Sequence, residues 1–323
     1  MANLTFPELA EQIQKHFAEG TYAEGLSLAS EKITAFPEEY PTINYWRICL
    51  AARLDQFDLA NKFLDTTLAS GIWFADFLLR QSPSLAGIQG NPEFERLAEI
   101  SAQMRAADAV DEIPLLIARP EDACGPGDTG CPTLVFLHAN MDTAQRNLEQ
   151  WAHLSAQGWL VAVPQSDQAL WTGAYTWANH ETTKTQIDAH YQRITSQYSI
   201  DTSRLILGGF SMGGEMALTL VLNHDFPASG FILLGPGGPK MDDLSEWLPF
   251  IKKAAGRDLR GVIWMGEDDL TIPQNKVRRL VEHLNAAGIT TKLETFPGLG
   301  HDYPENFKQV AARAINFILK DNI

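Results

Sequence analysis

Residues 205–214 read LILGGFSMGG, an apolar run that ends in glycines on both sides of one serine. An apolar run that stops at glycines predicts a short buried strand ending in a tight turn. The following residues, 215–222, favour a helix. Gly-x-Ser-x-Gly between a strand and a helix is typical of the sharp turn that presents a nucleophilic serine. Small residues must flank Ser211 because such a turn leaves no room for neighbouring side chains.

A serine hydroxyl is a weak nucleophile at neutral pH and needs a neighbouring base. The histidines after Ser211 are His224, His283 and His301. His301 closes the turn-rich stretch FPGLGH directly after an expected strand, which predicts a position at the same sheet edge as Ser211. His283 falls within a helical pattern and His224 at a helix end, so we expect both on the surface. His301 is therefore the candidate base.

The base in turn needs a carboxylate that orients it. Residues 261–269 read GVIWMGEDD, a buried-looking strand that ends in three acids. The sequence of this stretch does not by itself say which acid faces His301.

The region after residue 105 alternates short apolar runs with amphipathic stretches. Such alternation predicts an α/β fold, a mostly parallel sheet covered by helices, with its site at the carboxyl ends of the strands. We expect strands at Pro114–Arg119, Thr133–His138, Trp159–Pro164, Leu205–Gly208, Phe231–Leu234, Gly261–Met265 and Lys292–Phe296. We expect helices at 143–157, 181–198, 212–223, 274–287 and 304–320.

Residues 1–105 show helical periodicity and few strand signals, so we predict an all-helical N-terminal domain before a catalytic domain at 106–323. Two similar segments, 19–26 and 54–61, place aromatic residues 35 positions apart at Tyr22 and Phe57, close to the tetratricopeptide period. Two such units cannot bury their apolar faces alone. They would pack on the catalytic domain, on another protein or on a second copy of the chain.

A tetrahedral intermediate needs backbone N–H donors around its oxyanion. One donor should be the N–H of Met212, directly after the serine, and the other should come from the loop after an early strand. Residues 137–143, LHANMDT, form that loop. We expect His138 to shape the loop rather than to take part in the reaction.

These motifs resemble those of the carboxylesterase and lysophospholipase branch of the α/β-hydrolases, which includes the acyl-protein thioesterases. That branch has Gly-Phe-Ser-Gln-Gly-Gly at its serine, where this chain has Met212 in place of Gln. Its Leu-His-Gly-x-Gly-Asp-Thr loop corresponds to residues 137–143, with Ala139 and Met141 in place of the glycines. The resemblance implies an α/β-hydrolase fold and assigns the second oxyanion donor to the N–H of Asn140.

The resemblance also selects among the three acids. The family's His-Gly-x-x-Asp-x-x-Val-Pro corresponds to MGEDDLTIP at 265–273, and the spacing to Pro273 selects Asp269 over Asp268. The family's Pro-Gly-x-Gly-His is intact at 297–301. The chain order Ser, Asp, His is that of the α/β-hydrolases.

The function expected from these residues is carboxylic-ester hydrolysis through an acyl-enzyme, with a small-molecule substrate of short to medium acyl length. Thioesterase or peptidase activity by the same triad is the alternative. An adaptor with a silent hydrolase domain is the alternative from another class. Trp171, Tyr175 and Trp177 follow an expected strand and could line the substrate pocket, or could be buried against the helical region.

A formal net charge of −15 disfavours binding to nucleic acid and to anionic membrane surfaces. The sequence has no apolar run long enough to span a membrane and no signal-peptide pattern, so we expect a cytoplasmic protein. No Cys/His spacing predicts a metal site, and no motif calls for a cofactor. Cys124 and Cys131 could form a disulfide, but free thiols are the expectation from so sparse a cysteine count.

Overall fold

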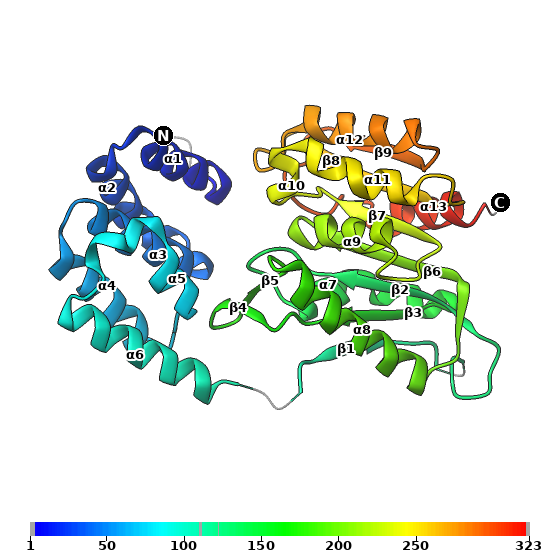
Figure 1. The fold of residues 1–323 in the computed structure, drawn as a ribbon, viewed down its shortest axis with the longest axis horizontal. Helices are drawn as coiled ribbons and strands as arrows, with labels where there is room; N and C mark the ends of the chain where they lie inside the picture. Colours follow the sequence, from blue (N-terminus) through cyan, green and yellow to red (C-terminus); the bar gives the residue numbers. More distant parts are fainter. Residues whose placement is uncertain (1–3, 110–111, 122, 321–323) are drawn as a thin grey trace. The chain divides into compact units, whose positions relative to one another are not determined.

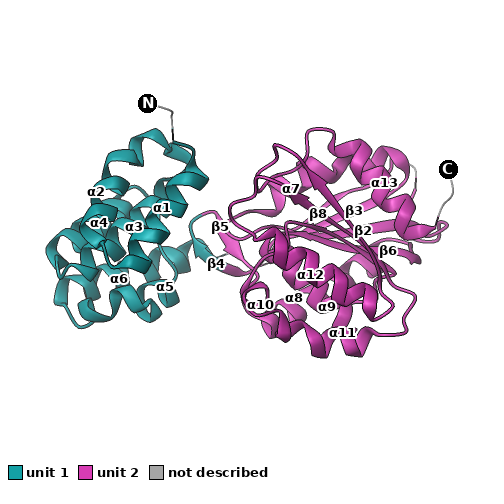
Figure 2. Cartoon of the chain, turned by 90° about the horizontal axis from the view of Figure 1, so that it is seen from above, with its two compact units in different colours: residues 1–111, 169–172 teal, residues 112–168, 173–323 magenta. Residues whose placement is uncertain are grey.

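A computed structural model describes residues 4–109, 112–121 and 123–320. The chain forms two compact units, coloured separately in Figure 2. The helical unit comprises residues 1–111 together with 169–172, and the α/β unit comprises 112–168 together with 173–323. A short hairpin therefore contributes four residues to the helical unit from the middle of the sequence of the α/β unit.

The helical unit contains no strand before residue 115 among its described residues, in line with the periodicity of its sequence. Its helices begin and end at recognisable signals: α1 is preceded by Thr5, whose N–H donates to Glu8, and α1 is followed by Gly20 in a left-handed conformation. The two segments that resemble each other span the junctions α1–α2 and α3–α4. The helices are α1 (Phe6–Glu19), α2 (Tyr22–Lys32), α3 (Tyr40–Arg53), α4 (Phe57–Ala69), α5 (Asp76–Gln81) and α6 (Pro92–Ala107).

The α/β unit is built on a seven-stranded sheet (Figure 1). All neighbouring strands are parallel except the first pair, β1 and β3, which is antiparallel. All seven predicted strands are present, which confirms the predicted fold class. In spatial order they are β1 (Leu115–Ala118), β3 (Leu160–Pro164), β2 (Cys131–Leu137), β6 (Ile200–Phe210), β7 (Gly230–Leu234), β8 (Arg260–Gly266) and β9 (Thr290–Phe296).

Helices cover both faces of this sheet, and the central strands are therefore apolar on both sides. Along β6, Leu205 and Leu207 face one core and Ile206 faces the other. The first core packs under α8 (His180–Gln197), α9 (Met212–Asn223), α11 (Leu248–Ala254) and α12 (Gln274–Ala286). The second packs under α7 (Ala144–Trp151) and α13 (Phe307–Leu319). The remaining helix, α10, is a single turn at Pro239–Asp242.

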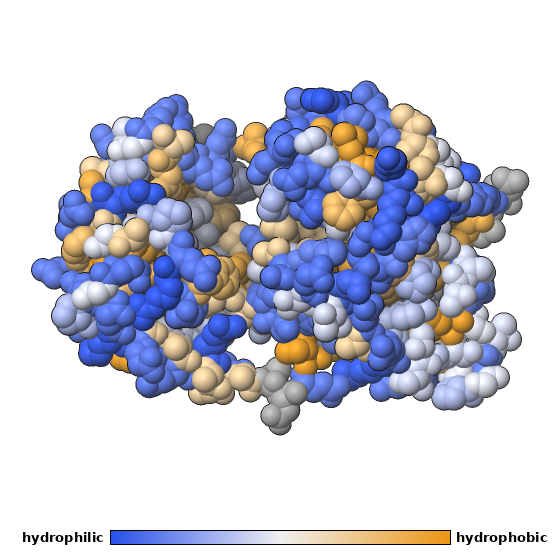
Figure 3. Space-filling model, viewed as in Figure 1, coloured by the Kyte–Doolittle hydropathy of each residue, from blue (hydrophilic) through white to orange (hydrophobic). Residues whose placement is uncertain are grey.

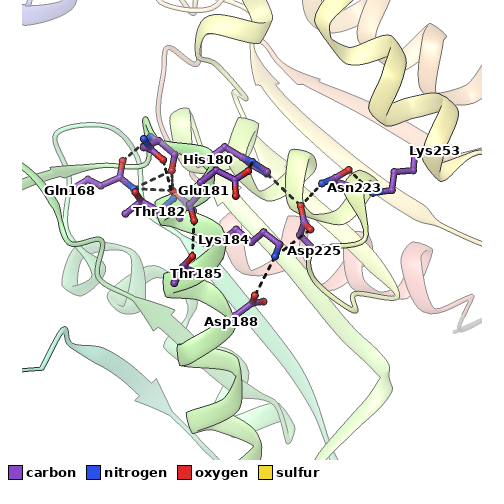
Figure 4. A network of polar contacts seen from close by, with 12 residues as sticks. Gln168, His180, Glu181, Thr182, Lys184, Thr185, Asp188, Asn223, Asp225 and Lys253 are labelled. Atoms are coloured by element: carbon purple, nitrogen blue, oxygen red, sulfur yellow. Dashed lines mark hydrogen bonds and ion pairs between the residues drawn. The ribbon is translucent and has the colours of Figure 1, made fainter.

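A polar network ties together helices on one face of the sheet (Figure 4). Asp225, just after α9, lies 3.5 Å from the ring of His180 and 3.9 Å from the Lys184 ammonium, both on α8. Asn223 donates to Asp225 and accepts from Lys253 of α11 at 2.8 Å. These contacts lie away from the glycines that surround Ser211.

Residues 168–176, where no strand was expected, form a hairpin of β4 (Gln168–Trp171) and β5 (Ala174–Thr176). The tip of the hairpin pairs within the helical unit: Ala75 donates to Leu170 at 2.7 Å, and Phe74 forms a β-bridge with Trp171. Strands that pair through backbone hydrogen bonds at a sheet edge need not be apolar, so the apolar runs of the sequence did not reveal this hairpin.

Cys124 and Cys131 form a disulfide, so the expectation of two free thiols is wrong. The turn between them brings their Cα atoms to 5.4 Å, within the range that a disulfide spans. A disulfide is typical of proteins in oxidising compartments, so it does not support the expected cytoplasmic location. In the described part of the chain, no helix has the length and apolar character required to cross a bilayer.

Candidate active site

Ser211 stands at the junction between β6 and α9 in a conformation that few residues adopt. Its φ is 52° and its ψ is −119°, outside the ordinary regions for a residue with a side chain. The turn is so tight that a side chain on Gly209 would overlap the Gly213 carbonyl, and one on Gly213 would overlap the His138 carbonyl. The glycines of the motif thus permit the turn, and the strained serine is presented at the carboxyl end of the sheet.

His301 and Asp269 form a directly bonded pair. His301 Nδ1 lies 2.6 Å from Asp269 Oδ2, and the Asp269 side chain is only 1% exposed. Asp269 Oδ1 accepts from the N–H groups of Thr271 at 2.8 Å and Ile272 at 2.9 Å. Asp268, by contrast, is exposed. The acid next to His301 is therefore Asp269, the one that the spacing to Pro273 selected.

The His301 ring lies beside the segment that carries Ser211. It packs on Phe210, the residue before the serine, with ring centroids 4.8 Å apart. Ser211 N–H donates to Leu234 at the end of β7 at 2.9 Å, and the next residue, Gly235, lies against His301 Cε1. His301 Nε2 is buried and has no hydrogen-bond partner among the described residues. That nitrogen is the one a triad base uses to take the serine proton.

The loop after β2 lies against the start of α9, where an oxyanion would be held. Met212 is the first residue of α9, and the first N–H groups of a helix have no partner within it. Met141 stands where the resembling family has glycine, and it adopts the left-handed φ of 59° that glycine would favour. Its N–H donates to the Tyr175 carbonyl at 2.8 Å and is therefore already bonded, and Asn140 is the residue directly before it in the loop.

His138 is fully buried beneath this loop. Its Nδ1 lies 2.8 Å from the Ala139 carbonyl, which can only accept, and its Nε2 lies 3.2 Å from the Ser166 N–H, which can only donate. Burial lowers the pKa of His138 to about 4, against the raising effect of the Ala139 carbonyl. A neutral imidazole with both nitrogens bonded shapes the loop, as its sequence context suggested.

A family model described as phospholipase/carboxylesterase matches residues 126–319, more than half of the chain. The chain belongs to the phospholipase/carboxylesterase family. Acyl-protein thioesterase 1 of Gibberella zeae is 29% identical to it over 147 residues, which cover 42% of this chain. The matched region spans 58% of that relative, less than two thirds of its length.

Solved structures show the same fold at low identity. An uncharacterised protein from Bacillus cereus aligns with a TM-score of 0.55 and 19% identity, covering 98% of this chain and 100% of that one. Zea mays acyl-protein thioesterase 2 aligns with a TM-score of 0.50 and 16% identity, covering 64% of this chain and 100% of that one. At these identities the likeness concerns the fold alone.

In this phospholipase/carboxylesterase family member, the three aromatic residues expected at the pocket have different surroundings. Trp177 is fully buried against His138, with ring centroids 4.9 Å apart. Trp171 belongs to the helical unit, is 7% exposed and packs edge-on against Phe74. Neither ring has much surface left for a substrate. Tyr175 is half-buried and forms a β-bridge with Asp142, next to the oxyanion loop.

Two further residues, Asn147 and Tyr303, connect the loops of the site and were not expected from the sequence. Asn147 donates to Asp142 at 2.8 Å and accepts from the hydroxyl of Tyr303 at 2.8 Å. Tyr303 packs edge-on against Phe210 and lies two residues after His301. The position of Tyr303 two residues after the candidate base could have suggested a role in the site. Its hydrogen-bond partner Asn147, however, lies 156 positions away in the chain, where no local pattern points to it.

Proposed function

We propose that this protein is a serine hydrolase that cleaves carboxylic esters through an acyl-enzyme. Ser211 would be the nucleophile, His301 the base and Asp269 the acid behind the base. The observation that carries the proposal is the 2.6 Å contact between His301 Nδ1 and the buried Asp269 carboxylate, which leaves Nε2 unbonded near the strained serine. The family is one of esterases, and its membership supports the reaction class.

The proposed reaction proceeds in two halves. His301 Nε2 takes the Ser211 hydroxyl proton as the oxygen attacks the ester carbonyl, and the N–H groups of Met212 and Asn140 donate to the resulting oxyanion. The intermediate collapses, the ester C–O bond breaks, and the alkoxide leaves with the proton from His301. A water molecule then gives a proton to His301 and attacks the acyl carbonyl. The bond between the acyl carbon and Ser211 Oγ breaks, the carboxylic acid leaves, and His301 returns the proton to Ser211.

The proposed substrates are esters with uncharged acyl groups of short to medium length. Most of the surface seen in Figure 3 is hydrophilic, yet large exposed apolar side chains lie next to two of the proposed site residues. Met141 is 44% exposed beside Asn140, and Leu270 is 59% exposed beside Asp269. Such side chains suit an apolar acyl group. The net charge of −15 disfavours anionic substrates.

A fluorophosphonate probe tests the nucleophile. We expect it to label the wild-type protein, and we expect Ser211→Ala to abolish labelling and ester hydrolysis. Labelling that persists in Ser211→Ala would place the nucleophile elsewhere. kcat/KM for nitrophenyl acetate, butyrate and palmitate tests the acyl length, and a clear preference for palmitate would contradict the proposed range.

Thioester hydrolysis is a second candidate because the Gibberella zeae relative is an acyl-protein thioesterase. A thioester reacts by the same steps, with a thiolate as the leaving group. Matched butyryl ester and thioester substrates separate the two activities through their kcat/KM values. A thioester advantage of more than about tenfold, or ~1.4 kcal/mol in barrier height, would favour this second candidate.

A further inference from the structure

Glu215 is a buried carboxylate in the first turns of α9 that the proposed reaction does not use. It is 3% exposed, and its own N–H donates to the carbonyl of Ser211 at 3.0 Å. Burial raises the pKa of its carboxyl group, against the lowering effect of the Lys240 ammonium. Burying a carboxylate costs folding free energy unless it is hydrogen-bonded or paired with a cation, so the partners of Glu215 indicate what this side chain holds in place.

The partners of Glu215 lie in residues 235–241, GPGGPKM, which follow β7 and include the first residues of the single-turn helix α10; this segment is called the 235–241 loop below. Oε2 accepts from the Met241 N–H at 3.2 Å, and Oε1 lies 3.8 Å from the Lys240 ammonium, whose side chain is 16% exposed. The loop backbone passes so close that a side chain on Gly238 would lie 2.6 Å from the carboxylate carbon. Glu215 thus holds the far end of the 235–241 loop by a hydrogen bond and an ion pair.

The near end of the same loop lies against each part of the proposed triad. Gly237 N–H donates to the Ser211 carbonyl at 3.0 Å. A side chain on Gly235 would lie 2.9 Å from His301 Cε1 and 3.4 Å from Asp269 Oδ2, and one on Gly237 would overlap Ile272. With three glycines, the loop has few side chains of its own to fix its path, so its anchors determine where it lies.

We propose that Glu215, paired with Lys240, is a positioning residue for the triad. It anchors the 235–241 loop, and the loop sets the separation of Ser211 and His301. This inference rests on the proposed function. Displacement of catalytic groups by about 1 Å can lower a rate by 10²-fold, so loss of the anchor acts on kcat rather than on substrate binding.

The test compares variants of the full-length chain that remove the anchor or conserve it. Glu215→Ala removes the acceptor, and we expect kcat for nitrophenyl butyrate to fall about 10- to 100-fold, with KM changed less than about threefold. Glu215→Gln keeps an amide oxygen for the Met241 N–H, and we expect most of kcat to survive. The rate of fluorophosphonate labelling should fall by the same factor as kcat in Glu215→Ala, because both need Ser211 aligned with His301.

A double-mutant cycle keeps the inference testable if Glu215→Ala fails to fold. Lys240→Met leaves a buried carboxylate unpaired and should lower kcat, and adding Glu215→Gln should restore most of it by removing that charge. Lys253→Met is the matched control: it removes an ammonium bonded to Asn223 and should leave kcat unchanged.

The outcomes separate this inference from the proposed function. A wild-type protein that neither hydrolyses esters nor reacts with the probe overturns the proposed function. An active wild type with kcat and labelling within about twofold in Glu215→Ala and Lys240→Met overturns the positioning role alone. Equal losses in Glu215→Ala and Glu215→Gln would also overturn it, because the hydrogen-bond acceptor would then make no difference.

Discussion

Replacing Asp269 by Asn should nearly abolish turnover and leave the fold intact. The Asn side-chain oxygen can still accept from the N–H groups of Thr271 and Ile272, so two of the three hydrogen bonds of Asp269 survive. The third is reversed, because the amide NH₂ would then point at His301 Nδ1 and donate to it. The imidazole proton would have to move to Nε2, and the ring could no longer take the proton of Ser211.

The same tautomer reversal in the serine protease triad lowers kcat about 10⁴-fold, which corresponds to about 5 kcal/mol in barrier height. We expect a loss of that order for Asp269→Asn, with a stability change under about 2 kcal/mol because one hydrogen bond is affected. The assay is kcat for nitrophenyl butyrate, with urea unfolding as the measure of stability.

Asp268→Asn is the matched control for this substitution. Asp268 is exposed, and its carboxylate has no hydrogen bond or ion pair within the described parts of the chain. Its replacement should leave kcat within about twofold. A crippled Asp268→Asn, or an Asp269→Asn that keeps more than about a tenth of wild-type kcat, would refute the assignment of the acid.

Three further predictions concern stability. Burial lowers the pKa of His138 to about 4, below its usual 6.5, so its stabilising contribution is complete above pH 6.5 and is lost as the pH falls toward 4. Between pH 7.5 and pH 5 we expect His138 to account for a loss of about 2 kcal/mol in urea unfolding, and His190, whose pKa burial also lowers to about 4, to add a similar loss. Equal stability at both pH values would contradict a buried neutral His138. Replacing Cys124 and Cys131 by Ser opens a short loop and should lower the free energy of unfolding by about 2 kcal/mol without changing kcat; reduced wild-type protein should match the double variant. Removing residues 1–105 deprives Trp171 of its packing partner Phe74, and we expect sedimentation to show aggregation of the fragment; a monomeric fragment of full stability would count against this.

The sheet was predictable because most of its strands contain an apolar run bounded by turn residues; β9, which reads TTKLETF, is the exception. The helix at 212–223 was predicted to the residue because the Gly-x-Ser-x-Gly turn marks its start; in the structure the left-handed His224 follows its end. The hairpin at 168–176 was missed because pairing of its backbone depends on Phe74 and Ala75, about 100 positions earlier. The helix at 248–254 was missed because seven residues are too few to show a helical period.

The candidate site was predictable where a motif has fixed local spacing. Ser211 and His301 each belong to a short pattern of glycines, and the distance to Pro273 selects the acid that the structure places 2.6 Å from His301. Contacts between distant segments left no such pattern. The contacts of Glu215 are with a loop more than 20 residues later in the chain, so the sequence around Glu215 does not show them. Trp177 was expected near a substrate because its burial against His138 arises only when the sheet folds.

The backbone of Ser211 has a thermodynamic consequence of its own. A residue with a side chain at φ 52° and ψ −119° costs on the order of 1–3 kcal/mol, and glycine would relieve much of that cost. Selection for stability alone would therefore favour glycine at this position, as at its neighbours 209 and 213. A Ser211→Gly protein should be inactive and yet melt at a higher temperature than the wild type. The difference in melting temperature would measure how much folding stability the chain gives up to expose one hydroxyl group.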